Sequence, residues 1–238
     1  MNQYLVCSSK SWGEYVFHKQ IKNYPGEWYF LPAQRYINWI EDYLYNTGIN
    51  PRYIFFIHWS DKVPKTITDQ YECIGFHPSP LPEGRGGTPV QNQIKDGYLF
   101  TELTAFRLTD EIDVGPIYLQ EYLSLDGTAE EIYINMSELA ADMIERIIEE
   151  NIEPEIQTGF VSQYKRREPH ESKINFNNVS GCSYLSYTLR DIYDHIRMLD
   201  AETYPRAFIE LDGFRYTFSR PTLKVGKIVC DVEITENE

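Results

Sequence analysis

Residues 53–57 read YIFFI, a continuous apolar run with the length of one β-strand. A strand that is apolar on both faces is typical of a parallel sheet covered by helices on each side. A second run, CIGF at residues 73–76, follows after a polar interval and ends at His77. The two runs predict neighbouring central strands in a mostly parallel sheet.

On either side of these two strands, the sequence pattern alternates between strands and helices. The apolar run Tyr4–Cys7 is followed by small polar residues and then by a helix-like segment, Trp12–Ile21. This order begins an α/β unit. Further strands are expected at 28–31, 102–108 and 117–123, and helices at 33–45, 89–95 and 128–148. Together these elements predict a Rossmann-like α/β fold.

The pattern changes after Asn151. A polar linker covers 155–172 and contains the basic cluster Lys165–Arg167. Beyond it we expect a helix at 189–199 and strands at 207–211, 215–219 and 228–234, the first two joined by Asp-Gly. We therefore predict two domains, a catalytic domain over 1–165 and, over 166–238, a linker with a small OB-like, β-rich domain.

Composition excludes several kinds of function. The 238 residues carry 22 Lys and Arg against 36 Asp and Glu, a net charge of −14. Because nucleic-acid binding draws on many contacts between cations and phosphates, we expect no nucleic-acid partner. The four cysteines form no CxxC pair, so we expect neither a metal site nor a disulfide framework. The sequence shows no signal peptide and no apolar run long enough to cross a bilayer, so we expect a cytoplasmic protein with no membrane partner.

Two polar residues stand where ligands bind in such folds. His77 ends a predicted strand, and Asp113 lies just past the strand predicted at 102–108. Ligands of parallel sheets bind at the carboxyl ends of strands, and a histidine held by a carboxylate is a workable acid/base pair. From spacing alone, both residues could equally be structural, with His77 bonded at a strand end and Asp113 capping a turn.

Two longer sequence motifs favour the functional interpretation of His77 and Asp113 over the structural one. HPSPLPEGRGGTP at 77–89, followed by DEIDVGPIY at 110–118, closely resembles the signature of 10-formyltetrahydrofolate-dependent formyltransferases. RREPHESKINF at 166–176 and YDHIRMLDAETYPRAFIELDG at 193–213 look like the linker and C-terminal module of the tRNA and sugar members of that family. The resemblance implies 10-formyltetrahydrofolate as co-substrate and no metal.

The resemblance also implies site residues. The family active site is an Asn, a His and an Asp, and His77 and Asp113 fall on the last two. The family Asn lies two residues before the His, where this chain has Gly75. Another donor must then stabilise the oxyanion of the tetrahedral intermediate. We expect Asn92 in this catalytic role or, failing it, Gln91. A folate-binding relic without activity is the alternative that Gly75 leaves open.

The remaining expectations concern binding. The resemblance places the folate against Leu108, Thr109, Asp110 and Asp113. It places the acceptor toward the first loop, with Lys10 and Arg85 as phosphate partners. The substrate-binding residues are expected to be Ser9, Lys10, Trp12, Ser79, Arg85 and Gln91. His58, which ends the first central strand, could point into the site or be an ordinary strand-end histidine.

The acceptor is the last choice. The net charge of −14 argues against tRNA, and 19 Tyr with 4 Trp are available to stack on a base. The motif FHPSPLPEGRGGTPVQN at 76–92 is most like that of enzymes that formylate a UDP-linked 4-amino-4,6-dideoxy sugar in pseudaminic-acid-type pathways. We therefore expect a nucleotide-linked amino sugar as acceptor, with methionyl-tRNA formyltransferase as the alternative. The oligomeric state stays open, a homodimer included.

Overall fold

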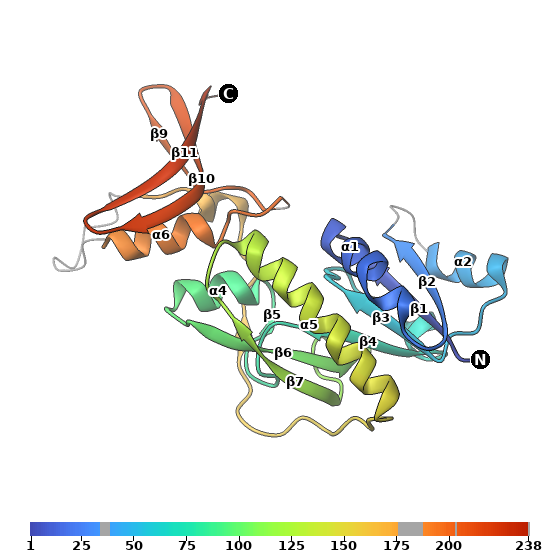
Figure 1. Ribbon diagram of the computed structural model, residues 1–238. Coiled ribbons are helices and arrows are strands. Elements are labelled where there is room, and N and C mark those ends of the chain that lie inside the picture. The colour runs from blue at the N-terminus through green and yellow to red at the C-terminus, as the bar shows by residue number, and fades with distance from the viewer. Residues whose placement is uncertain (34–38, 176–187, 203, 238) are drawn as a thin grey trace. The chain divides into compact units, whose positions relative to one another are not determined.

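A computed structural model describes residues 1–33, 39–175, 188–202 and 204–237. The chain packs into two compact units, drawn in Figure 1. The N-terminal unit consists of residues 1–86, 101–123 and 133–164. The C-terminal unit consists of residues 87–100, 124–132 and 165–238. The expected domain boundary at 165/166 stays a prediction, and two earlier segments pack with the C-terminal part.

A six-stranded sheet of order β2-β1-β3-β4-β6-β7 organises the first unit. β1 pairs in parallel with β2 and β3, β3 pairs in parallel with β4, and β4 is antiparallel to β6. The predicted mostly parallel α/β sheet is thereby confirmed. The strands are β1 Gln3–Ser8, β2 Glu27–Pro32, β3 Tyr53–Ile57, β4 Glu72–His77, β6 Phe100–Arg107 and β7 Ile117–Ser124.

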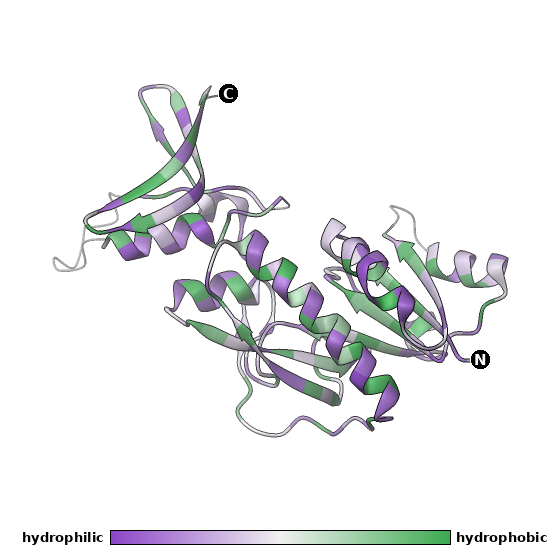
Figure 2. Cartoon of the chain, in the orientation of Figure 1, coloured by the Kyte–Doolittle hydropathy of each residue, from purple (hydrophilic) through white to green (hydrophobic). Residues whose placement is uncertain are grey.

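The two apolar runs form the centre of this sheet. Every residue of β3 is buried, and so is every residue of β4 after Glu72. Figure 2 shows the central strands as mostly hydrophobic. Burial on both faces is what a parallel sheet between helices requires. The polar residues that follow these strands are thus fixed in place at its carboxyl edge.

Helices connect the strands. The expected helix at 33–45 corresponds to α2, and residues 34–38 lie outside the described part of the chain. Thr128 and Glu131 form a capping box: the Glu131 carboxylate accepts from the Thr128 backbone N–H at 2.7 Å, and the Glu131 backbone N–H donates to the Thr128 hydroxyl at 3.3 Å. The helices are α1 Ser11–Lys19, α2 Trp39–Thr47, α3 Lys65–Thr68 and α5 Ala129–Glu149, with a 3₁₀ turn at Ile21–Asn23.

A three-stranded antiparallel sheet, of order β11-β10-β9, occupies the described part of the C-terminal unit. Helix α6 packs against β10. The fully buried Arg197 pairs with Asp194 and donates to the carbonyls of Leu125 and Gly127. The small β-rich module is therefore confirmed. Its elements are α6 Leu189–Arg197, β9 Phe208–Leu211, β10 Phe214–Lys224 and β11 Lys227–Glu236, and the unit also holds α4 Pro89–Lys95 and a 3₁₀ turn, Pro169–Ser172.

Two expectations from composition can be compared with the described residues. None of the described helices is both long and apolar enough to span a membrane. Among the described cysteines, Cys7 and Cys73 are buried free thiols and Cys230 is partly buried. Cys182 lies outside the described residues.

Candidate active site

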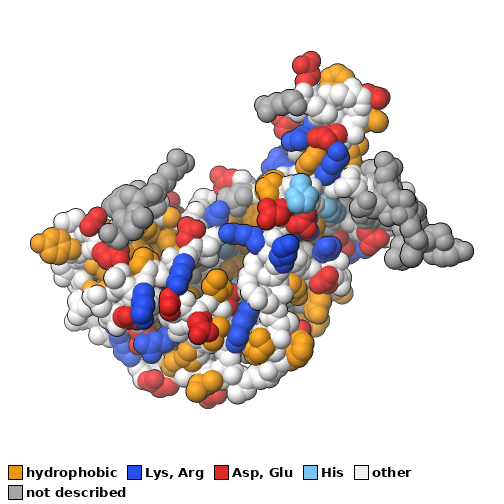
Figure 3. All heavy atoms as spheres, turned by 180° about the vertical axis from the view of Figure 1, so that it is seen from behind, with side chains coloured by type: hydrophobic (Ala, Val, Ile, Leu, Met, Phe, Trp, Pro, Cys, Tyr) orange, Lys and Arg blue, Asp and Glu red, His pale blue; other side chains and the backbone are white. Residues whose placement is uncertain are grey.

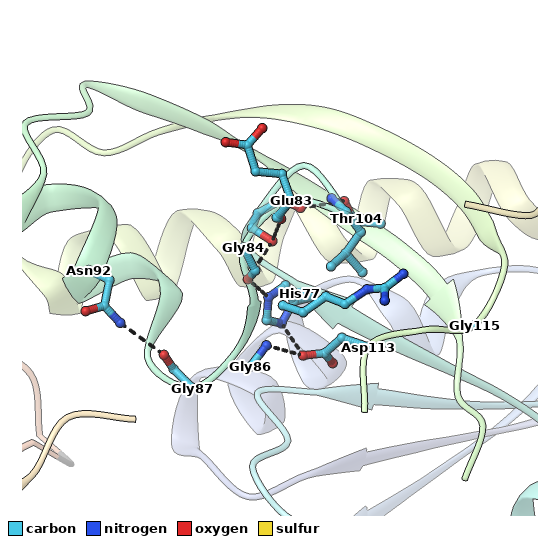
Figure 4. A network of polar contacts seen from close by, with 12 residues as sticks. His77, Glu83, Gly84, Gly86, Gly87, Asn92, Thr104, Asp113 and Gly115 are labelled. Atoms are coloured by element: carbon cyan, nitrogen blue, oxygen red, sulfur yellow. Dashed lines mark hydrogen bonds and ion pairs between the residues drawn. The ribbon is translucent and has the colours of Figure 1, made fainter. Parts of the chain in front are cut away.

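His77 is the last residue of β4, and its ring is held from one side by the loop that follows. Its Nε2 atom lies 2.9 Å from the Gly84 carbonyl oxygen, and the residue is 8% exposed. A carbonyl can only accept, so Nε2 carries the hydrogen of this bond. The other nitrogen, Nδ1, is therefore the ring atom that can take up or release a proton. Figure 4 shows both sides of the ring.

Asp113 lies on the Nδ1 side. One of its carboxylate oxygens, Oδ2, is 3.6 Å from His77 Nδ1 and accepts a hydrogen bond from the Gly86 backbone N–H at 2.8 Å. The Asp113 backbone has φ 55°, a left-handed conformation that Asp tolerates better than most residues. The structure thus brings together the two residues, 36 positions apart, that the sequence singled out. Their distance is compatible with the expected acid/base pair, and the catalytic role of both residues stays a prediction.

The loop after His77 is fixed from within. Ser79 is fully buried, and its hydroxyl donates to the carbonyls of Glu83 at 2.8 Å and Gly84 at 3.1 Å. Thr104 on β6 donates to the Ser79 carbonyl at 2.6 Å. We expected Ser79 to bind substrate. Its hydroxyl instead holds the carbonyl that orients His77, and burial keeps it from direct contact with an acceptor.

A pocket of 360 Å³ opens beside Asp113. It includes Thr109 and Asp110, two of the residues expected to hold the folate. The exposed Asp110 also pairs with Lys62, which lowers the pKa of its carboxyl. Most of the remaining lining lies within the motif at 110–118, whereas Ile156 comes from the polar linker, where no pattern marks it. The lining is Thr109, Asp110, Glu111, Val114, Gly115, Pro116 and Ile156.

Leu108, also expected at the folate, fills the space beside Gly75. A Cβ atom placed on Gly75 would lie 2.7 Å from Leu108 Cδ2 and 3.3 Å from Phe106. Gly75 is not among the residues with positive φ. The backbone therefore tolerates a side chain at the position of the family Asn, and it is the Leu108 side chain that stands in its way.

The Asn92 side chain is bonded to backbone carbonyls. Its side-chain nitrogen lies 3.0 Å from the Thr88 carbonyl, 3.1 Å from that of Gly87 and 3.2 Å from that of Lys165. Its role as oxyanion donor stays a prediction, and it would require release of these bonds. Gln91 is fully buried and donates to the Met198 carbonyl at 3.1 Å. That position argues against both of the roles expected for Gln91, as substitute donor and as substrate contact.

The first loop is anchored to the end of β3. The Ser9 hydroxyl donates to the His58 carbonyl at 2.6 Å, and Lys10 occupies the N-cap position of helix α1. Trp12 is buried, stacks on Tyr133 at 5.0 Å and meets the His58 ring edge-on at 5.2 Å. Ser9 and Lys10 are half-buried and remain candidates for acceptor binding. Trp12 is only 6% exposed, which argues against direct stacking on a base, and its role in binding stays a prediction.

Arg85 was expected to bind phosphate. Its guanidinium donates to the side-chain oxygen of Gln157 at 2.5 Å and 3.2 Å. Gln157 lies in the segment predicted as a polar linker, and its side chain is bonded to the turn that carries Asp113. No signal in the sequence marks it, because the linker has neither periodicity nor a motif. In the described ranges, no group of three or more His, Cys, Asp or Glu side chains could hold a metal ion.

Comparisons with known proteins can now be set beside this geometry. A family model described as "Formyl transferase" matches residues 45–148, and one described as "Methionyl-tRNA formyltransferase, C-terminal domain" matches residues 169–235. Among solved structures, the methionyl-tRNA formyltransferase from Clostridium thermocellum is 35% identical, with a TM-score of 0.89 and coverage of 100% of both chains.

A curated relative is more distant. The methionyl-tRNA formyltransferase of Thermodesulfovibrio yellowstonii is 28% identical over 139 residues, which are 55% of this chain and 45% of that protein. The chain thus spans about half the length of that relative. A sugar N-formyltransferase from Shewanella is 17% identical, with a TM-score of 0.59, and the alignment covers 100% of this chain and 99% of that protein. At this identity the similarity shows the fold alone.

These findings overturn the expected acceptor. The relatives of higher identity and the C-terminal family model all bear the name of methionyl-tRNA formyltransferase. A nucleotide-linked amino sugar as acceptor, and the absence of a nucleic-acid partner, were therefore wrong. The physical error was to average charge over the chain. Residues 1–164 hold 11 Lys and Arg against 24 Asp and Glu, whereas residues 165–238 hold 11 against 12.

The expectation of the family itself is confirmed. The strings around His77 and Asp113 fall inside the first matched range, and most of the two C-terminal strings fall inside the second. A solved relative at 35% identity covers the chain from end to end. The chain belongs to the formyltransferase family.

Proposed function

We propose that this protein transfers the formyl group of 10-formyltetrahydrofolate to the amine of methionyl-tRNA. The observation that carries the proposal is the 35% identity, over the whole of both chains, with the Clostridium thermocellum methionyl-tRNA formyltransferase. The family match of residues 169–235 to the C-terminal domain of that enzyme class supports it independently.

The donor fits the pocket beside Asp113. Its volume of 360 Å³ lies within the usual range for small-molecule sites. Val114, Pro116 and Ile156 supply apolar walls, while backbone groups of the same turn can bond to the edge of a pterin. The formyl carbon would then lie near His77, because the pocket and the Asp113 carboxylate share one turn.

The reaction makes one bond and breaks another. The amine nitrogen attacks the formyl carbon and forms the new C–N bond, and the bond from that carbon to N10 of the folate breaks. One proton leaves the amine and one arrives at N10, so the overall charge is unchanged. A group that can hold that proton between the two steps lowers the barrier.

His77 is placed to hold this proton. Nε2 is engaged with the Gly84 carbonyl, so the proton is exchanged at Nδ1. When Nδ1 is protonated, the imidazolium faces the Asp113 carboxylate at 3.6 Å. Opposite charges at that distance stabilise the protonated ring. Asp113 therefore favours the step in which His77 takes the proton of the attacking amine.

The polyanionic acceptor suits the C-terminal part of the chain. Residues 165–238 have nearly balanced charge, and they begin with Lys165, Arg166 and Arg167. Figure 3 shows Lys and Arg side chains interspersed with acidic ones on the face in view. Because phosphate contacts release counterions, binding of tRNA through these cations would weaken steeply as salt is added.

The test is direct. The protein is incubated with 10-formyltetrahydrofolate and methionyl-tRNA, and formyl-methionine is read by mass after the ester is hydrolysed. UDP- and dTDP-linked amino sugars are run in parallel, and the His77→Asn variant serves as the inactive control. The proposal expects formyl-methionine from the wild-type protein only. Absence of product from methionyl-tRNA at saturating donor would refute it.

A further inference from the structure

The segment at residues 155–164, here called the strap, leaves helix α5 and runs beside both loops of the site. Its last two residues, Gln163–Tyr164 (β8), pair in parallel with Arg85–Gly86 (β5). The Ser162 hydroxyl accepts from the Gly84 backbone N–H at 2.8 Å. The Ser162 carbonyl accepts from the Arg85 backbone N–H at 3.0 Å. The strap is thus bonded to the loop that orients His77.

The strap is also bonded to the turn that carries Asp113. The side-chain nitrogen of Gln157 donates to the carbonyl oxygens of Asp113 at 2.9 Å and Gly115 at 2.7 Å. An amide nitrogen has two hydrogens, and here each has an acceptor. Arg85 donates to the Gln157 oxygen at 2.5 Å, which fixes the orientation of the amide, with its nitrogen toward the turn.

The turn itself is tightly folded. Asp113 has φ 55°, and a Cβ placed on Gly115 would lie 1.7 Å from the Arg107 carbonyl oxygen. Gln157 is bonded to the carbonyls of Asp113 and Gly115. These two residues flank Val114, which lines the pocket. A left-handed residue in such a turn persists only when its surroundings hold it. One side chain bonds both ends of the turn and orients the backbone from which the Asp113 carboxylate projects.

We propose that Gln157 is a positioning residue for formyl transfer, which holds the Asp113 turn so that its carboxylate stays against His77 and the Gly86 amide. Arg85 keeps the Gln157 amide in the productive orientation. The strap therefore links the two loops of the site. The effect on turnover rests on the proposed function, whereas the effect on the turn is independent of it.

Two substitutions separate this role from simple packing. Gln157→Leu removes both donors and the acceptor. Gln157→Glu keeps an acceptor for Arg85 but removes both donors, and it sets a carboxylate against the carbonyls of Asp113 and Gly115. If Gln157 served only to anchor Arg85, the Glu variant would behave like wild type. Thr158→Val, at an exposed position next to Gln157 on the same strap, is the matched control.

The first measurement needs no activity. Hydrogen exchange of the Gly86 amide, resolved by NMR, reports its bond to the Asp113 carboxylate. Both Gln157 variants should speed this exchange by about tenfold while β3 and β4 amides keep their protection. Thr158→Val should leave it unchanged. Unchanged exchange in both Gln157 variants would overturn the proposal, whether or not the protein formylates methionyl-tRNA.

The second measurement is turnover on methionyl-tRNA. Both Gln157 variants should lose about ten- to a hundredfold in kcat, the scale of a displaced catalytic group, with little change in the KM for tRNA. In the Asp113→Asn background, Gln157→Leu should cost less than about threefold more, because both changes act through one carboxylate. Full additivity, or a loss confined to KM, would overturn the positioning role.

Discussion

Two histidines end neighbouring strands of the same sheet, and their surroundings differ completely. His58 follows β3 and His77 ends β4, and these strands pair in parallel. His58 Nε2 is bonded to the Ser137 hydroxyl at 2.6 Å, and its ring lies against Trp12 and Tyr133. Burial lowers the pKa of His58 to about 3, so this ring is neutral across the physiological range.

His77 has the opposite arrangement. One ring nitrogen is fixed by the Gly84 carbonyl, and the other faces the Asp113 carboxylate at the site. A ring that must carry a proton needs a partner for its charged form, and only His77 has one. A position at the carboxyl edge of the sheet is therefore not enough to make a histidine catalytic. The groups around the ring decide whether it can carry a proton.

The largest effect on turnover that tests this difference between His77 and His58 is expected from a change at the Asp113 carboxylate. Asp113→Asn keeps the size of the side chain and removes the charge that stabilises protonated His77. We expect turnover on methionyl-tRNA to fall by about a hundredfold, within the range of acid/base contributions. Tetrahydrofolate binding, followed by fluorescence, should change little. Wild-type turnover with weakened folate binding would instead assign Asp113 to the pocket alone.

A smaller effect is expected from the pH dependence of stability. The pKa of His58 is lowered in the folded protein to about 3, from about 6.5 when unfolded, so between these values the unfolded chain binds more protons. The stability that depends on neutral His58 is therefore complete above pH 6.5 and is lost as the pH falls toward 3. At pH 5 the loss is about 2 kcal/mol.

Urea unfolding at pH 7 and pH 5 measures this loss. The matched variant is His58→Asn, since Asn tolerates the left-handed φ of 51° at this position. The wild-type protein should lose about 2 kcal/mol more than the variant on acidification. An equal loss in both proteins would mean that His58 can be protonated without disturbing its site.

The smallest effect concerns Gly75. Gly75→Asn introduces the family residue against Leu108 Cδ2, the far end of a half-buried and flexible side chain. We expect a destabilisation of about 1 kcal/mol, at the low end of overpacking. Leu108→Ala should relieve it, which a double-mutant cycle of unfolding free energies would show as coupling. Simple additivity would contradict the crowding seen at this position.

Much of the fold was predictable from the sequence. The apolar runs of β3 and β4 fixed the centre of the sheet, and the capping box at Thr128 fixed the start of α5. Local patterns suffice there because burial and caps are local demands. His77 and Asp113 were found because each lies in a long ordered motif of the family.

The rest of the site could not be predicted. Gln157 acts through two bonds across more than forty positions, and nothing in its own neighbourhood signals them. The internal contacts of Trp12 and Ser79 could not be predicted, because the sequence does not show whether a polar or aromatic loop residue contacts a ligand or the protein itself. The acceptor was misjudged because net charge is a sum, and binding depends on where the charges lie.

We infer that His77, at the end of β4, takes part in formyl transfer, whereas His58, after β3, has a structural role. This difference in role is tested most directly by single-turnover formylation of methionyl-tRNA with His77→Asn and His58→Asn, each normalised to its folded fraction. We expect His77→Asn to lose at least about a hundredfold in rate, whereas His58→Asn should stay within about tenfold of wild type. Equal losses in the two variants, or a His77→Asn enzyme with more than about a tenth of wild-type rate, would contradict it.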